Sequence, residues 1–95
     1  MMLVFVAYDI SENKDRNNLI KKLRHYGLHR VQKSFFAGDL SINERLDLLD
    51  ELEIFLSSER DSIMLLPACE SCKESINIFS DIEVYLPKKI EFKFL

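Results

Sequence analysis

The stretch LVFVAYDIS, residues 3–11, decides the fold, because in it an apolar strand runs directly into the start of a helix. The unbroken apolar run from Leu3 to Tyr8 predicts a strand that is covered on both faces. Side chains alternate along a strand, so residues 4, 6 and 8 share one face and the odd-numbered residues 3–9 share the other. Asp9 ends the strand on the odd-numbered face. A carboxylate there needs a reason: a helix cap, a partner or a catalytic role.

The predicted helix begins at Ser11 and stops at Gly27, with apolar residues 19, 20, 23 and 26 at helical spacing. Its basic residues Lys21, Lys22 and Arg24 point away from that apolar stripe, toward water or a polyanion. Either Asp9 or Ser11 has a side chain suited to cap this helix.

The rest of the chain alternates between the same two kinds of element. Residues 28–40 read as extended structure whose phase changes near residues 33–34, which predicts two short strands or one bent strand. Ser41 and Glu44 form a capping box that opens a second helix, with apolar residues 42, 46, 49, 52 and 55 on one stripe. Residues 62–66 are wholly apolar after Ser62, and extended segments follow at 81–86 and 90–95.

This order predicts an α+β fold: a ferredoxin-like two-layer sandwich, with two helices on one face of an antiparallel sheet and an extra C-terminal strand. Residues 1–95 form one domain. Segments 3–8 and 62–66 are the most apolar and are expected to be the central strands. Two helices cover only one face, so apolarity on both faces predicts a homodimer, in which 88–95 pairs with the partner subunit.

Composition and charge limit the functional classes. No apolar run reaches the ~18–20 residues that span a bilayer, no leader segment is recognisable, and two cysteines make no disulfide framework; we expect a cytoplasmic protein with no membrane contact. The net charge of −3 is segregated, with +4 over residues 1–38, −9 over 39–83 and +2 over 84–95. A nucleic-acid partner would therefore meet the first third of the chain, unless these charges are ordinary solvated helix faces.

Three constellations carry possible chemistry. Asp9 suits Mg²⁺, which takes one or two protein carboxylates and completes its shell with water and substrate phosphate; a two-fold dimer would supply a second Asp9. Cys69 and Cys72 have zinc-like spacing but would need His25 and His29 as further ligands, and the thioredoxin-like βαβ context of a redox pair is absent. The set Ser34, Asp39, His25 and His29 contains the residue types of a hydrolase triad, but no elbow motif supports one.

The segments VFVAYDIS, YGLHRVQKSFFAGDL and DSIMLLPACESC, in this order and spacing, resemble the small CRISPR-associated Cas2 proteins. The resemblance runs from Leu3 to Cys72. It implies a ferredoxin-like homodimer and, in some members, a metal-dependent endonuclease acting on single-stranded RNA or double-stranded DNA.

The family's metal-binding aspartate falls on Asp9, its neighbouring tyrosine on Tyr8, two arginines on Arg16 and Arg30, and an aromatic residue on Phe36. A further arginine of some members falls on Asn18, a departure from the pattern. Besides these, we expect Lys21, Lys22 and Ser34 to contact nucleic acid. A second family role follows from the resemblance: a non-catalytic adaptor that bridges CRISPR integrase dimers during spacer acquisition, for which Asp9 is dispensable. A toxin-like ribonuclease on a related sandwich is a third reading, by fold analogy.

Overall fold

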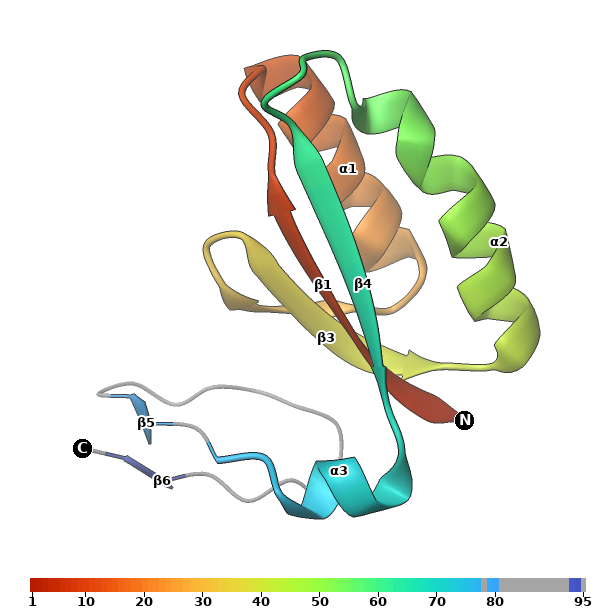
Figure 1. Ribbon diagram of the computed structural model, residues 1–95, viewed down its shortest axis with the longest axis vertical. Coiled ribbons are helices and arrows are strands. Elements are labelled where there is room, and N and C mark those ends of the chain that lie inside the picture. Colours follow the sequence, from red (N-terminus) through yellow and green to blue (C-terminus); the bar gives the residue numbers. More distant parts are fainter. Residues whose placement is uncertain (78, 81–92, 95) are drawn as a thin grey trace.

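Strand β1 (Met2–Asp9) lies in the middle of a four-stranded antiparallel sheet, between β3 (Phe35–Leu40) and β4 (Ser62–Ala68) (Figure 1). Strand β2 (His29–Gln32) pairs with β3, so the order across the sheet is β2-β3-β1-β4. The computed structural model describes residues 1–77, 79–80 and 93–94 and confirms the predicted α+β, ferredoxin-like arrangement.

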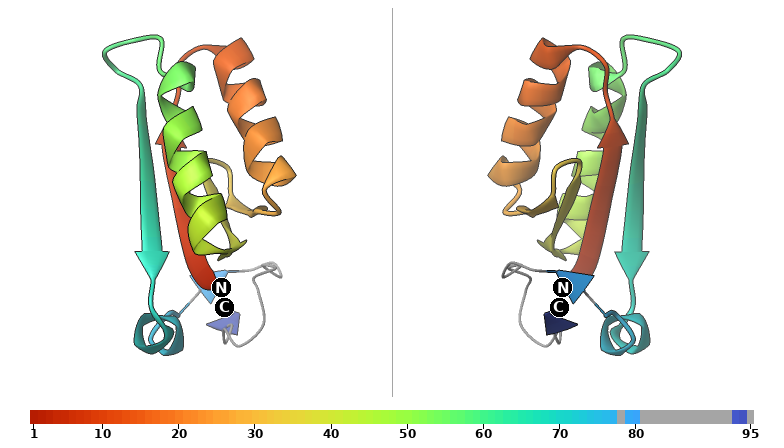
Figure 2. Two further views of the ribbon diagram at one scale, coloured as in Figure 1. Left: turned by 90° about the vertical axis from the view of Figure 1, so that its right-hand side faces the viewer. Right: turned by 90° about the vertical axis from the view of Figure 1, so that its left-hand side faces the viewer.

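Helices α1 (Asn13–His25) and α2 (Ile42–Leu52) lie side by side on one face of the sheet, and a short 3-10 turn, η1 (Glu53–Phe55), follows α2 (Figure 2). Residues 4, 6 and 8 of β1 share one face, as the alternation predicts, and this face turns toward the helices. The core between the layers consists of Val4, Val6, Tyr8, Ile10, Leu19, Leu23, Leu28, Phe36, Leu40, Leu48, Leu52 and Phe55.

The ends of the helices follow local chemistry. The hydroxyl of Ser41 accepts from the Glu44 amide at 3.1 Å, and the Glu44 carboxylate accepts from the Ser41 amide at 2.9 Å, so the predicted capping box is present. Helix α1 begins two residues later than expected, after Glu12, whose side chain makes no cap. Gly27, at φ +85°, lets the chain reverse after α1.

Two expectations about the apolar segments are wrong. Among the described residues β4 is an edge strand, not a central one; its apolar side chains Met64 and Leu66 are 57% and 45% exposed on the face away from the helices. The stripe predicted for the second helix is buried at Leu52 and Phe55, but Ile42, Leu46 and Leu49 are exposed, and Leu48 faces the core in their place. Alternative apolar positions on α2 fit a helical period equally well, so periodicity could not select the buried ones.

Beyond β4 the chain forms a short helix, α3 (Glu70–Glu74), and strands β5 (Phe79–Ser80) and β6 (Lys93–Phe94) pair in parallel. The strand expected at 81–86 lies outside the described residues, as does all of the segment 88–95 except β6, so pairing with a partner subunit stays a prediction. In the part of the chain that the structure describes, no helix is long and apolar enough to cross a membrane.

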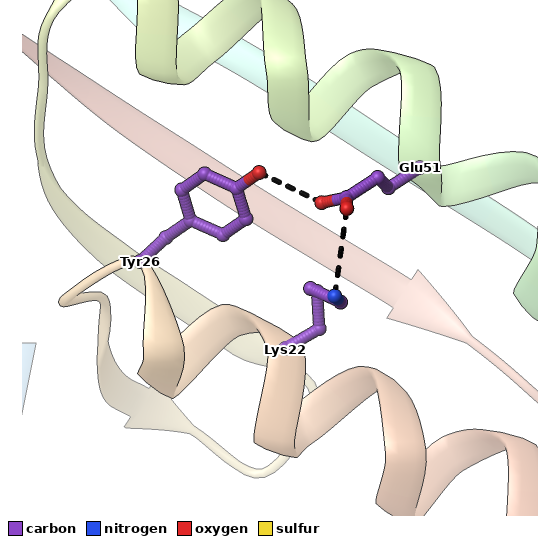
Figure 3. A network of polar contacts seen from close by, with 3 residues as sticks. All are labelled: Lys22, Tyr26 and Glu51. Carbon is purple, nitrogen blue, oxygen red and sulfur yellow. Dashed lines mark hydrogen bonds and ion pairs between the residues drawn. The ribbon is translucent and has the colours of Figure 1, made fainter.

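A polar network joins the two long helices (Figure 3). The Tyr26 hydroxyl donates to Glu51 at 2.7 Å, and Lys22 Nζ lies 3.5 Å from the other oxygen of the same carboxylate. The hydrogen bond to Glu51, aided by burial, raises the pKa of Tyr26 to about 12. Lys22 is therefore half-buried and paired with α2, whereas the sequence predicted that it points freely outward.

Candidate active site at the end of strand β1

Asp9 lies where three segments of the chain meet. On one side it is paired with Ser62, the first residue of β4. On the other side the Tyr8 amide donates to the carbonyl of Ser34, in the turn between β2 and β3, at 3.0 Å. The side chain of Asp9 is exposed on the face of the sheet that the helices leave uncovered.

The carboxylate of Asp9 is free for an external partner. Within residues 1–77, 79–80 and 93–94 it takes part in no hydrogen bond or ion pair, and it does not cap α1, whose cap position is Glu12. Ser11 is not a cap either, because its hydroxyl and amide both donate to Asp61. The helix-cap explanation of Asp9 is therefore wrong.

Tyr8 lies behind Asp9 rather than beside it. Its side chain is buried in the core, and its hydroxyl donates to the carbonyl of Lys33 at 3.1 Å. Together with the Tyr8 amide bond to Ser34, this contact fixes the turn between β2 and β3 against the end of β1. Tyr8 thus positions the turn; its hydroxyl does not face the solvent as a catalytic group would.

Asp61 holds the opposite side of the site, and sequence reasoning did not identify it. One carboxylate oxygen accepts from the amide and hydroxyl of Ser11 at 2.9 and 2.8 Å. The other accepts from the amide and hydroxyl of Ser57 at 3.1 and 3.3 Å. Asp61 therefore joins the loop after Asp9 to the loop before β4. Ser57 is only four residues from Asp61, but Ser11 is 50 residues away, so no local pattern signals the contact between the two loops.

This bonding makes stability depend on pH in acid. The amide of Ser11, with the groups of Ser57, lowers the pKa of Asp61 from 3.8 to about 2. A depressed pKa means that the stabilisation is complete above about pH 4 and is lost as the pH falls toward 2. We expect Asp61→Asn to lower the melting temperature at neutral pH, with the difference from wild type shrinking between pH 4 and 2.

Circular dichroism melts at several pH values measure this effect. Asp50→Asn, which removes an exposed carboxylate from α2, is the control and should melt in parallel with wild type. A constant difference between Asp61→Asn and wild type down to pH 2 would contradict the assignment.

Arg16 supports the loop that follows Asp9. Its guanidinium donates to the carbonyl of Ile10 at 3.1 Å and to the side chain of Asn13. The residue is half-buried, so it combines a structural contact with a positive charge close to the end of β1.

Other predicted nucleic-acid contacts lie along α1 and β2. Lys21 is exposed on α1, and Arg30 is exposed on β2 with its guanidinium 5.4 Å from the centre of the Phe36 ring. Phe36 itself is fully buried, so its ring supports Arg30 and the core and cannot stack on a base. A hollow lined by Arg24, Gly27, Leu28, His29 and Arg30 joins the end of α1 to β2.

The donor set decides which metal sites are feasible. No group of three or more histidine, cysteine or acidic side chains gathers in the described part of the chain, so the zinc site with His25 and His29 receives no support. The proposed triad is not assembled either, because Asp39 pairs with Lys73. A single free carboxylate fits Mg²⁺, whose remaining ligands are water and phosphate oxygens.

Comparison with known proteins identifies close relatives. The family described as CRISPR associated protein Cas2 matches residues 2–76. A protein of Archaeoglobus fulgidus named CRISPR-associated endoribonuclease Cas2 1 is 38% identical over 93 residues, covering 96% of this chain and 99% of the relative. A CRISPR-associated endoribonuclease Cas2 of Thermofilum pendens is 29% identical and covers 97% and 98%.

Solved structures similar to this chain support the same family assignment. The crystal structure of Cas2 from Streptococcus pyogenes superposes with a TM-score of 0.67 at 25% identity, covering 79% of this chain and 95% of that one. A hypothetical protein of Thermus thermophilus superposes with a TM-score of 0.64 at 32% identity, covering 72% and 82%.

Proposed function

The chain belongs to the Cas2 family of CRISPR-associated proteins, and from that premise we propose that it is a Mg²⁺-dependent endonuclease that acts on RNA or DNA as a homodimer. The observation that carries the proposal is the free carboxylate of Asp9 at the end of the central strand. The printed names of the curated relatives, which call them endoribonucleases, support the same class of reaction.

The homodimer is supported by the part of the sheet face opposite α1 and α2 that the described residues leave exposed. This face carries Met64 and Leu66, exposed on β4, beside the half-buried and stacked rings of Phe5 and Phe35. An apolar sheet face of this kind is stabilised when a second copy covers it. Asp9 lies at the end of the same face, so a two-fold dimer would bring a second Asp9 toward the first.

In this proposal Asp9 would hold the metal, and bound Mg²⁺ would lower the pKa of a water molecule and offset charge on the phosphate. Arg16, which contacts Ile10, and the exposed Lys33, whose carbonyl accepts from Tyr8, lie near the strand end and would attract the phosphodiester backbone. Tyr8 and Asp61 act as positioning residues, because they fix the two loops between which Asp9 stands.

The test is cleavage of labelled single-stranded RNA and double-stranded DNA by the purified dimer, with Mg²⁺ or with a chelator. We expect cleavage of at least one substrate that stops when the metal is removed. Cleavage that continues in the chelator would contradict a metal at Asp9. If a folded dimer cleaves neither substrate, the proposal that the protein is a nuclease would be contradicted.

A second function is favoured by the basic surface of α1. Lys14, Lys21 and Arg24 are exposed at spacings that place them on one side of the helix, and the hollow beside β2 adds Arg30. Such a surface would hold a DNA fragment by its phosphates without any catalysis. As an adaptor, the dimer would present this DNA to a CRISPR integrase during spacer acquisition.

For the adaptor role we expect Lys21→Glu and Arg30→Glu each to weaken binding of double-stranded DNA several-fold. Each phosphate contact removed should also lower the slope of log affinity against log salt by about one. Fluorescence anisotropy at several salt concentrations measures both. The control is Arg45→Glu, which makes the same charge change on α2, and equal weakening by all three variants would contradict a specific basic surface.

A further inference from the structure

Two cysteines lie in contact at the far end of β4. Cys69 and Cys72 are both exposed and free, and their sulfur atoms are 3.3 Å apart. Cys69 occupies the cap position of α3, directly after β4 ends at Ala68. The C-x-x-C pair thus opens a short helix after a strand, but β4 and β5 lie in different sheets, so the described residues form no thioredoxin-like βαβ unit.

The geometry suits a bond between the two sulfurs. Residues three apart in the first turn of a helix lie on the same side. A disulfide needs its sulfurs about 2.0 Å apart. Rotation about the side-chain torsions is the movement required to close the remaining gap from 3.3 Å.

The two thiols differ in acidity. The backbone and thiol of Cys72 lower the pKa of the neighbouring Cys69, whereas the Cys69 sulfur raises the pKa of Cys72. The thiolate is the reactive form. Cys69 is therefore suited to attack a disulfide first, and Cys72 is suited to attack the mixed disulfide that Cys69 then forms.

The turn that carries the thiols is anchored, which keeps them together. Lys73 follows Cys72 and is almost fully buried; its ammonium lies 3.5 Å from Asp39 on β3 and 3.6 Å from Glu70. The nearer Asp39 oxygen is buried and has no hydrogen bond within the described residues, so the charge of Lys73 is what compensates it. Because this pairing fixes α3 to the sheet, little chain entropy remains to be lost when the sulfurs join.

We propose that Cys69 and Cys72 form a reactive dithiol whose substrate is a small-molecule disulfide such as oxidised glutathione. The Cys69 thiolate attacks one sulfur of the substrate, forms a mixed disulfide and releases one glutathione thiolate, which takes up a proton. Cys72 then loses its proton, attacks the Cys69 sulfur and releases the second glutathione. The protein dithiol is oxidised by two electrons and the substrate disulfide is reduced to two thiols. An exposed disulfide of this kind is readily reduced again, so the reaction is reversible.

The test uses the full chain and three forms: wild type, Cys69→Ser and Cys72→Ser. Each reduced protein is exposed to oxidised glutathione, quenched in acid and weighed by intact mass spectrometry. We expect wild type to lose two hydrogens per chain and retain no glutathione. Cys72→Ser should accumulate one glutathione, and it should do so several-fold faster than Cys69→Ser.

Each contrary result overturns the proposal. Wild type that keeps a bound glutathione would show that Cys72 does not resolve the mixed disulfide. A dimer linked by a disulfide would show that the thiols react between chains. Equal rates of glutathione addition to the two serine variants would contradict the assignment of Cys69 as the attacking thiol and Cys72 as the resolving thiol. Circular dichroism of all three proteins checks that each is folded. The mass-spectrometric results do not depend on nuclease activity.

Discussion

Replacing Asp9 with asparagine is expected to lower Mg²⁺-dependent cleavage by roughly 100-fold or more, because a lost metal ligand removes several kcal/mol of stabilisation from the transition state. The fold should be unaffected, since the carboxylate has no partner among the described residues. The substitution keeps the size of the side chain and removes only its charge. Initial rates of cleavage at several Mg²⁺ concentrations measure the effect.

Asp50→Asn serves as the matched control, because it removes an exposed carboxylate from α2, away from the end of β1. It should cleave at the wild-type rate. Sizing chromatography of every variant separates a loss of catalysis from a loss of the dimer. Wild-type activity in Asp9→Asn would remove Asp9 from the reaction, and DNA binding that survives alongside would then favour the adaptor.

Replacing Phe36 with alanine is expected to destabilise the protein by about 3–5 kcal/mol, because the ring is fully buried between the sheet and the helices. That loss is a large part of the ~5–15 kcal/mol that stabilises a typical domain. Phe36→Leu keeps most of the volume and should cost less. Chemical denaturation followed by circular dichroism measures both.

Phe35→Ala is the internal control, since its ring neighbours Phe36 in sequence but lies half-buried on the opposite face, stacked on Phe5 at 5.3 Å. It should lose less stability than Phe36→Ala. A Phe36→Leu variant with unchanged stability but much weaker RNA binding would contradict the assignment of Phe36 to the core, and would return the ring to the nucleic-acid surface.

Local rules account for the parts of the fold that sequence reasoning predicted well. The capping box at Ser41 and the stop at Gly27 depend on neighbouring residues only, and both are present. The phase change near residues 33–34 is the turn between β2 and β3, with a register shift just before it. The alternation in β1 correctly placed Tyr8 and Asp9 on opposite faces of the sheet.

The wrong predictions concern residues whose surroundings depend on which strands and helices pack together. Apolar composition led to β4 being placed in the centre, whereas its exposed residues lie on the open face of an edge strand. Resemblance placed Phe36 near nucleic acid, but its pairing with Val6 in the neighbouring strand turns the ring inward. The helical spacing predicted that Lys22 points outward, but its ammonium lies 3.5 Å from Glu51 on α2. Contacts between distant segments leave no local signal in one sequence.

The order of the strands also bears on how the protein is made. β1 is the first strand to be synthesised, yet its pairing partners are residues 35–40 and 62–68, so its second edge has no partner until about two-thirds of the chain exists. Contacts so distant in sequence slow folding, and an unpaired apolar strand is the segment most prone to aggregate meanwhile. Leu3–Tyr8, which defines the mature sheet, is therefore also the segment of the nascent chain that most needs protection.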